Sequence, residues 1–354
     1  MTTYLKYFKL FSVASVIAVG IAFFFSGIMG ATTVAILAVL EVSLSFDNAV
    51  VNSMVLSKMS EVWKKRFVTW GILVAVIGMR LLLPLAIVAV SARTNPIDVL
   101  RMAIYNPKLY SSLLSGAHIA VAGFGGSFLA MIFFGYFINS EKEEHWFPLI
   151  EAPLAKLGVV EGIHGALTLG SMALVTFFMS SGDKISFLLA GISGIIAHVM
   201  VEGFGTLLGG EDGGDKAVEL GAKSGIAGFV YLEMLDASFS FDGVMGAFSV
   251  SDRLLLITLG LGIGALFVRS LTLLAVDSGK LAGYAFLEHG AFYAIGALMT
   301  FTFIGTIKPL PEAVTGLIGA GIILLAFLDS LREKKREESS EKISPAVVVG
   351  QTIK

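Results

Sequence analysis

The chain has 354 residues, of which 56% are hydrophobic and only 15% are charged, and its mean hydropathy is +0.85. Soluble domains typically contain about 25% charged residues, so this composition argues against a soluble domain and predicts an all-α, polytopic helical membrane protein. Cysteine is absent, which excludes disulfides and thiolate metal sites, and the formal net charge of −2 identifies no partner.

A helix needs about 20 apolar residues to cross a lipid bilayer. In chain order, ten segments are candidates for such spans: 10–29, 32–56, 67–91, 112–138, 160–180, 185–208, 225–249, 254–276, 286–306 and 313–330. The count falls to nine if residues 286–330 are organised differently. The basic start and the first apolar segment resemble a secretory signal, but the many later spans favour an uncleaved first span.

The distribution of basic residues predicts the orientation of the chain, because Lys and Arg concentrate in cytoplasmic loops. With the N-terminus placed inside, 17 of the 25 Lys and Arg residues fall on the inner side and six on the outer side. Both termini are therefore predicted to be cytoplasmic, in a multi-pass protein of the cell (inner or plasma) membrane. The charged segment 331–354 is predicted to be a disordered cytoplasmic tail.

Two acidic phrases occur about two hundred residues apart, "LEVSLSFD" at 40–47 and "LDASFSFD" at 235–242. They lie in the second and seventh predicted spans, and this odd offset makes the two spans run in opposite directions. A second pair, "GMRLLLPLAIV" (78–88) and "FVRSLTLLAV" (267–276), aligns Arg80 with Arg269. The pattern predicts an inverted-topology repeat, which in transporters places the site at the repeat interface near the midplane.

The repeat divides the chain into five predicted parts. They are a first transmembrane helix at 1–30, a first repeat at 31–139, connecting helices and loops at 140–222, a second, inverted repeat at 223–330, and the tail. Within the connecting region, "EKEEHWFPLIEAPLAKLG" (141–158) is interpreted as a solvated amphiphilic loop, and "EDGGDKAVELGAK" (211–223) as a linker.

Charged residues inside the predicted spans are unbalanced. The second and seventh spans contain five acids: Glu41, Asp47, Glu233, Asp236 and Asp242. Arg80 and Arg269 are the predicted charge partners, which leaves about three surplus negative charges if every acid is ionised. A charge at mid-bilayer costs about 2.5–3.5 kcal/mol on insertion scales. The surplus therefore predicts neutralisation by protons or by a cation.

Helical spacing arranges the polar residues of each phrase along one stripe. In the first phrase the stripe consists of Glu41, Ser45, Asn48 and Asn52. In the second it consists of Glu233, Asp236, Ser240 and Gly243. Asp47 lies about 120° away from its stripe, and Asp242 is similarly displaced. Both acids of a phrase can face one ligand only if the helix is distorted, so we predict local unwinding at "SFDN" and "SFDG".

These residues offer only oxygen atoms to a ligand. The predicted metal ligands are Glu41, Ser45, Asp47, Asn48, Glu233, Asp236, Ser240 and Asp242. Such a set suits Mn²⁺, Ca²⁺ or Mg²⁺ better than softer metals. Crowded carboxylates take up protons when a metal leaves, so exchange for protons is expected. In the alternative interpretation, the acids only pair with arginines, serines and asparagines as contacts between helices.

Histidines are weaker candidates for the same site. His198 and Glu202 are spaced i,i+4, which permits chelation but more often gives an ordinary hydrogen bond. His118 and His289 each follow the arginine-bearing span of their half of the chain. The glycines near these two histidines favour close helix packing over phosphate binding, because no strand precedes them.

The acidic phrases also resemble a known family. "LEVSLSFDNAVV", "WGILVAVIGMR" and "YLEMLDASFSFDGVMGAFSVSDRLLLITLGLGIGALFVR" are similar to the two signature regions of the TerC family of integral membrane proteins. That family is named for tellurium resistance and belongs near the lysine-exporter and cation-exchanger superfamilies. The resemblance covers roughly residues 35–90 and 228–277, and departs at Gly243, where the family pattern has a small hydroxylated residue. "SGAHIAVAGFGG" and "EKEEHW" resemble a subgroup without an assigned function.

The resemblance implies that the bound ion is Mn²⁺ and that it moves out of the cytoplasm. The leading hypothesis is therefore a secondary transporter that exports a divalent metal cation, with no organic cofactor and no nucleic-acid partner. An alternative is a membrane assembly factor that supplies metal to secreted proteins, acting as a homo-oligomer or with secretion machinery. An intramembrane metalloenzyme is less favoured, because the chain contains no HExxH motif.

Overall fold

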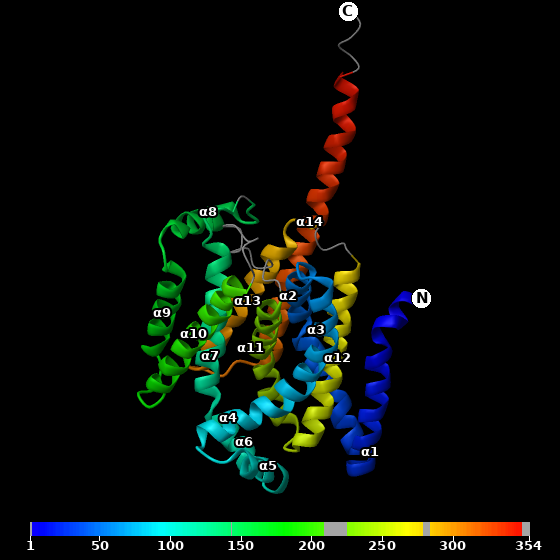
Figure 1. Cartoon of the computed structure of the whole chain (residues 1–354), viewed down its shortest axis with the longest axis vertical. Helices are drawn as coiled ribbons and strands as arrows, with labels where there is room; N and C mark the ends of the chain where they lie inside the picture. Colours follow the sequence, from blue (N-terminus) through cyan, green and yellow to red (C-terminus); the bar gives the residue numbers. More distant parts are fainter. Residues whose placement is uncertain (1, 143, 209–224, 279–283, 349–354) are drawn as a thin grey trace, which may run out of the picture.

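The computed structural model describes residues 2–142, 144–208, 225–278 and 284–348, and within these ranges all regular secondary structure is helical. The elements, shown in Figure 1, are α1 (Thr2–Leu44), α2 (Phe46–Ser57), α3 (Glu61–Leu73), η1 (Val74–Leu82), α4 (Leu83–Ser91), α5 (Pro96–Tyr105), α6 (Pro107–Gly116), α7 (His118–Phe137), α8 (Pro148–Lys156), η2 (Leu157–Val159), α9 (Ile163–Thr176), α10 (Lys184–Leu208), α11 (Ile226–Val250), α12 (Leu254–Asp277), α13 (Leu287–Gly305) and α14 (Glu312–Val348). The predicted all-α class is confirmed.

The first long helix is bent into two arms. Gly27 has φ +62° and ψ −158°, a conformation that only glycine adopts without a steric penalty. The arm before Gly27 corresponds to the predicted span 10–29. The second arm continues through Ser45 into α2, and together they correspond to the predicted span 32–56.

Seven helices of the described chain are long and apolar enough to cross a membrane, or eight if the bent pair Pro148–Val159 and Ile163–Thr176 forms one span. The protein is therefore a multi-pass membrane protein. The predicted count of ten is higher for three reasons. It divides α1 at its bend, it includes the 14-residue α9, and it includes α11, whose three acids break the apolar run.

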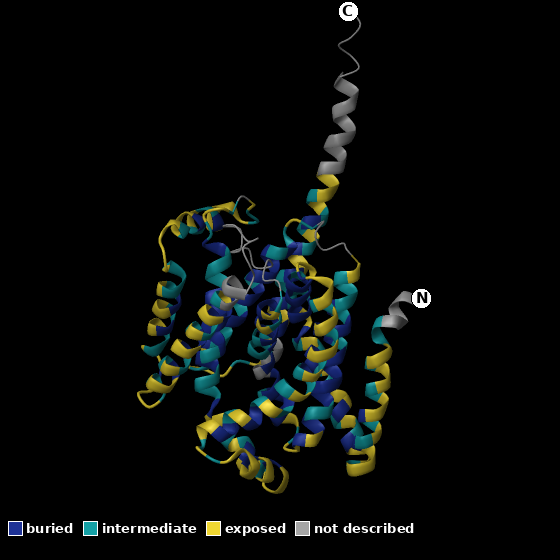
Figure 2. Ribbon diagram, in the orientation of Figure 1, coloured by how far each residue is buried: buried dark blue, intermediate teal, exposed yellow. Residues whose placement is uncertain are grey.

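The outer surface of the bundle is apolar, as a lipid environment requires. Large hydrophobic side chains are exposed on the outer helices, for example Phe24 on α1, Leu174 on α9 and Leu317 on α14. Buried residues concentrate where α2, α7, α11, α12 and α13 meet (Figure 2). The acidic phrases lie in this inner group of helices.

The two acid-bearing helices are antiparallel. Asn48 on α2 contacts Asp236 on α11, while Glu41, earlier in the chain, lies against Gly243, later in the chain. The two arginine-bearing segments also cross in opposite directions, since Gly71 lies beside Arg269 and Val76 beside Gly262. This is the relation that the predicted inverted repeat requires.

The predicted tail begins inside α14. The helix continues through residue 331 to Val348, the side chains of residues 337–348 are not described, and residues 349–354 lie outside the described residues. The segment is rich in Glu, Lys and Arg, which are good helix formers. Ion pairs at i,i+3, such as Arg332 with Asp329, add to its stability. The predicted linker 211–223 lies outside the described residues.

Candidate functional site

The first acidic phrase contains a helix break at the predicted place. Ser45, with φ −106° and ψ +17°, separates α1 from α2, and Asp47 Oδ1 accepts a hydrogen bond from the Asn48 N–H at 2.9 Å. The prediction of a distorted helix at "SFDN" is thus confirmed, although the break is limited to one residue.

The equivalent prediction for "SFDG" is wrong, because α11 is continuous from Ile226 to Val250. Gly243 serves another purpose there. A Cβ atom at this position would lie 2.9 Å from Glu41 Oε2, so the glycine allows the acid of one helix to approach the backbone of the other. The side chain of Asp242, a predicted ligand, lies outside the described residues.

Arg80 lies in a π-helical segment, η1, which widens the helix between α3 and α4. Its guanidinium is buried, and Nη1 donates to the carbonyl of Ala75 at 2.9 Å. Single π-helical turns occur frequently at functional sites. The next helix, α4, has Pro84 in its first turn, and this proline has no N–H to donate to the carbonyl of Arg80. The sequence pattern of this segment did not predict a π-helix.

The same guanidinium joins the two halves of the chain. Arg80 Nη2 lies 2.6 Å from Glu41 Oε1, and Nη1 lies 3.2 Å from Asp236 Oδ2. Asn48 Nδ2 donates to the other oxygen of Asp236 at 2.6 Å, and the Ser45 hydroxyl donates to Glu41 at 3.4 Å. Five predicted site residues therefore form one buried network across the α1–α2 and α11 crossing.

Arg269 forms a second network beside the first. Its Nη2 lies 3.0 Å from Glu233 Oε1, and its Nη1 donates to the carbonyl of Gly71. The guanidinium also stacks 3.7 Å above the ring of Phe67. Each arginine thus pairs with an acid of its own half and reaches a group from the other half, as repeat-related residues would.

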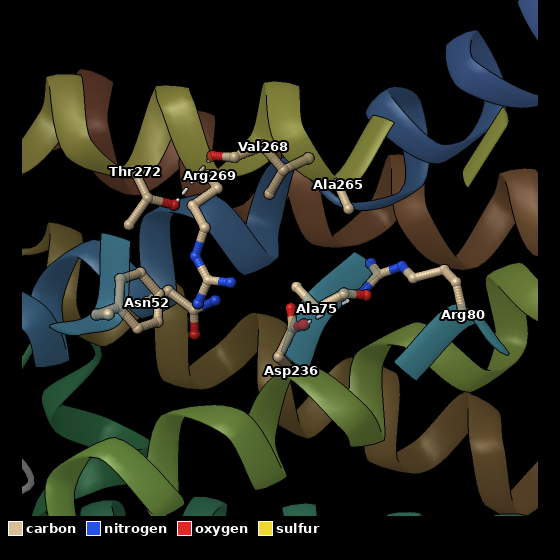
Figure 3. Close-up of a pocket in the computed structure, with 9 residues that line it drawn as sticks. Asn52, Ala75, Arg80, Asp236, Ala265, Val268, Arg269 and Thr272 are labelled. Carbon is tan, nitrogen blue, oxygen red and sulfur yellow. Dashed lines mark hydrogen bonds and ion pairs between the residues drawn. The ribbon is translucent and has the colours of Figure 1, made fainter. Parts of the chain in front are cut away.

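A small cavity of about 10 Å³ separates the two arginines (Figure 3). Arg80 and Arg269 approach it from different sides, and Asp236 and Asn52 also line it. This volume is about that needed for one water molecule. Several buried acceptors in this region have no hydrogen-bond partner: Asn48 Oδ1, Asn52 Oδ1, Glu233 Oε2 and Ser240 Oγ. The site therefore contains oxygen atoms that can accept a further hydrogen bond.

Asp47 has different neighbours from Glu41. Its side chain is only 3% exposed, and among the described residues no Lys, Arg or His forms an ion pair with it. It faces α14, where a Cβ atom on Gly319 would lie 2.6 Å from Asp47 Oδ2. A cavity of about 20 Å³ lies beside it, lined in part by Ser45 and Thr315. The predicted angular separation of the two acids is thus retained despite the break.

The buried acids outnumber the buried bases. The four acids are Glu41, Asp47, Glu233 and Asp236, the two bases are Arg80 and Arg269, and all six residues are at least 90% buried. Within the described ranges, however, no three acidic, histidine or cysteine side chains converge on a point that would hold a metal ion. One reason is visible in the first network, where Arg80 lies between Glu41 and Asp236.

The weaker histidine candidates lie in other surroundings. His198 Nδ1 lies 3.7 Å from Glu202 Oε2 on α10, and its ring contacts that of Phe128 edge-on. The two side chains of this i,i+4 pair therefore lie close together, but at a distance longer than a hydrogen bond. His289 pairs with Glu151 instead of an acid of the predicted site, and His118 is the first residue of α7.

The segment 141–158 contains a buried glutamate that its sequence pattern did not predict. Glu151 is 0% exposed, although this segment was expected to be solvated. Its Oε2 accepts from Lys142 Nζ at 3.1 Å and from the Trp146 N–H at 3.3 Å. Its Oε1 accepts from the Phe147 N–H and the Tyr293 hydroxyl, each at 3.1 Å. Glu151 therefore ties the α7–α8 connection to α13.

Burial by itself raises the pKa of Glu151, but its hydrogen-bond donors outweigh this effect. Hydrogen bonds from His289 and the Phe147 N–H, together with the charge of Lys142, lower the pKa of Glu151 to about 2. No spacing rule indicates such a residue, because its partners come both from the loop just before α8 and from α13, about 140 residues later.

The fold and the site define a multi-pass helical membrane protein with a buried network of acids and arginines at an antiparallel helix crossing. The chain belongs to the family described as protein of unknown function (DUF475), whose model matches residues 46–337. Comparison with curated proteins and with solved structures finds no match.

Proposed function

We propose that this protein is a secondary transporter that exports a divalent metal cation, with Mn²⁺ as the expected ion, in exchange for protons. The observation that carries the proposal is the surplus of buried acids where two antiparallel helices cross. Ionised acids are unstable in a low-dielectric interior unless a positive charge neutralises them. The two arginines neutralise only part of this negative charge, and Asp47 has no described basic partner.

The chemistry of the donors favours a hard cation. Glu41 and Asp236 supply carboxylates, Asn48 supplies an amide oxygen and Ser240 a hydroxyl, and the last two have unpartnered acceptor atoms. Oxygen donors of this kind suit Mg²⁺, Ca²⁺ and Mn²⁺. The resemblance of both acidic phrases to the TerC family supports Mn²⁺ among the three.

Arg80 would act as the counter-charge when no cation is bound. Its contact with Asp236, at 3.2 Å, is longer than its contact with Glu41, at 2.6 Å. We expect an arriving cation to displace the guanidinium from Asp236 while Arg80 keeps Glu41. When the cation leaves, Arg80 returns to Asp236, and protonation of an acid without a described basic partner, such as Asp47, would replace the lost charge, which would link export to proton uptake.

An antiparallel pair of acid-bearing helices suits alternating access. Related helices of opposite direction can exchange conformations, so that a site at their crossing opens first to one side and then to the other. The one-residue break at Ser45 gives α1 and α2 a place at which to bend relative to each other.

The direct test is Mn²⁺ uptake into proteoliposomes that contain the purified protein and a Mn²⁺-sensitive dye. Asp236→Asn should lower the initial rate at least about tenfold, because loss of a charged ligand costs more than about 1.4 kcal/mol. Asp98→Asn is the control, since Asp98 is an exposed acid in an i,i+3 pair with Arg101. Wild-type flux that survives Asp236→Asn unchanged, or a folded wild-type protein without Mn²⁺ flux, would contradict the proposal.

A further inference from the structure

A larger cavity lies at the end of the bundle where α14 leaves it, away from the acid network. It has a volume of about 540 Å³ and is lined by Trp146, Phe147, Phe286, Arg332, Glu333 and Arg336, together with Asp329. Ligand sites in proteins commonly have volumes of about 300–1,000 Å³. Figure 1 shows α8 and the projecting part of α14 at this same end of the molecule. The transport hypothesis does not use this cavity.

One wall of the cavity is aromatic and firmly held. The Trp146 ring lies 4.5 Å from that of Phe147 and stacks 6.5 Å from that of Phe286. Trp146 Nε1 donates to Asp329 Oδ2 at 3.2 Å, which fixes the indole against α14. The backbone N–H groups of Trp146 and Phe147 are both bound by the buried Glu151 described above. A buried carboxylate therefore positions this wall.

The opposite wall carries mixed charges. The side chains of Arg332 and Arg336 are 77% and 81% exposed, and they pair at i,i+3 with Asp329 and Glu333 at 2.8 and 3.7 Å. Exposed pairs of this kind contribute only about 0–1 kcal/mol, so a phosphate group can compete for the guanidiniums. Glu333 offers a carboxylate to a positive group beside that phosphate.

The position of the cavity along α14 identifies its environment. The apolar run of this helix ends at Leu328 and charged residues follow from Asp329, so the two arginines lie just beyond its apolar part. Tryptophan is enriched at this depth, where the lipid headgroups meet water, and basic residues that follow a span attract lipid phosphates.

We propose that this cavity binds the headgroup of a membrane phospholipid, with the phosphate on Arg332 and Arg336 and the aromatic wall against the glycerol region. Because acids and bases alternate in the lining, a zwitterionic phosphoethanolamine headgroup fits better than a purely anionic one. Its phosphate meets the arginines, and its ammonium meets Glu333. The shared phosphate chemistry also exists in soluble phosphomonoesters, so the test must separate the two sources.

The experiment is native mass spectrometry of the full-length protein released from nanodiscs that contain equal amounts of phosphatidylethanolamine and phosphatidylglycerol. The wild type should retain phosphatidylethanolamine, and the double variant Arg332→Gln/Arg336→Gln should retain at least about fivefold less. Arg101→Gln is a matched control, because Arg101 is also exposed and pairs at i,i+3 with an aspartate. It should retain lipid as the wild type does.

A further variant and a competition measurement complete the test. Trp146→Leu removes the aromatic wall without touching a charge and should also lower retention, which guards against misfolding of the double variant. Soluble phosphoethanolamine at millimolar concentration should not displace the lipid. Equal retention by wild type and both variants would overturn the proposal. Binding of soluble phosphoethanolamine in place of lipid would show that the cavity takes a soluble phosphate compound and not a lipid headgroup.

Discussion

Arg80 holds two buried carboxylates that come from different halves of the chain. Removal of such a residue costs more free energy of folding than its ion pairs contribute on balance. Removing one partner from a buried pair leaves an uncompensated charge, which costs about 3–5 kcal/mol. Glu41 and Asp236 would then repel each other across the helix crossing unless another positive charge enters.

Arg80→Gln should therefore destabilise the protein by about 3–5 kcal/mol in the absence of metal. Added Mn²⁺ should recover part of this loss, because the ion would replace the guanidinium between the two acids. Thermal unfolding in detergent, with and without Mn²⁺, measures both effects. Arg101→Gln serves as the control. An Arg80→Gln variant that is as stable as the wild type, or unaffected by Mn²⁺, would refute this role.

Glu151 allows a prediction of pH dependence. Its pKa in the folded protein is about 2, below the ordinary value of 4.5, so the unfolded chain binds more protons between these values. The stabilisation by Glu151 is complete above about pH 4.5 and is lost as the pH falls toward 2. With allowance for solvent screening, it amounts to about 2 kcal/mol.

Glu151→Gln should thus lower the unfolding temperature at pH 7, and the difference from wild type should shrink as the pH is lowered to 3. Differential scanning fluorimetry in detergent across this range is a suitable measurement. Glu161→Gln, at an exposed position between η2 and α9, should behave as the wild type does. A difference that stays constant with pH would show that the charge of Glu151 is not what stabilises the connection.

The acids and arginines of the site could be predicted because charge inside an apolar segment is a strong local signal. Glu41, Asp236 and Arg80 stand out in the sequence, and all three meet in the structure. Glu151 could not be predicted, since it belongs to a segment whose charge is typical of a solvated loop. Its burial depends on Tyr293 and His289, which follow it by about 140 residues.

Among the helices, the elements around the acids differ most from regular geometry. The break at Ser45 follows a polar phrase and was predictable, whereas the π-helix at η1 was not. A π-helical turn leaves the hydrophobic pattern almost unchanged, so composition and periodicity carry no signal for it. The continuity of α11 shows that Gly243 permits close packing there instead of a break.

Helix α14 also depends on glycine for its position. Gly319 lies against Asp47, whereas Gly321 on the same helix has open space around its Cα. Gly319→Ala should displace α14 or the Asp47 side chain, at a cost of about 1–3 kcal/mol. Gly321→Ala should instead stabilise the helix by about 0.5–1 kcal/mol, because alanine is the better helix former. Unfolding temperatures and Mn²⁺ flux of the two variants test this difference, and equal behaviour of both would show that α14 does not confine Asp47.

For the whole molecule, the charge distribution predicts which end faces the cytoplasm. The junction of α2 and α3 carries Lys58 and the basic run 64–66, and Lys58 pairs with Glu288 beside the Glu151 cluster. This is the end at which α8 lies, whereas α5 and α6 lie at the opposite end (Figure 1). By the excess of positive charge, the α8 end should be inside.

The absence of cysteine makes this orientation simple to test, because any introduced thiol is unique. Asp98→Cys on α5 should react with a membrane-impermeant maleimide in intact spheroplasts. Glu61→Cys, at the start of α3, should react only after permeabilisation. Both positions have exposed side chains, so access is limited only by the membrane. The reverse pattern would place the termini outside.

In the proposed mechanism a divalent cation binds where the two acidic helices cross and displaces the Arg80 guanidinium from Asp236. Anomalous diffraction at the manganese edge, from crystals of the full-length protein grown with Mn²⁺, would locate this ion. We expect a single strong peak in contact with Asp236, with Arg80 withdrawn from that carboxylate. Crystals soaked at saturating Mn²⁺ that show Arg80 still bridging Glu41 and Asp236, and no peak between α2 and α11, would contradict it.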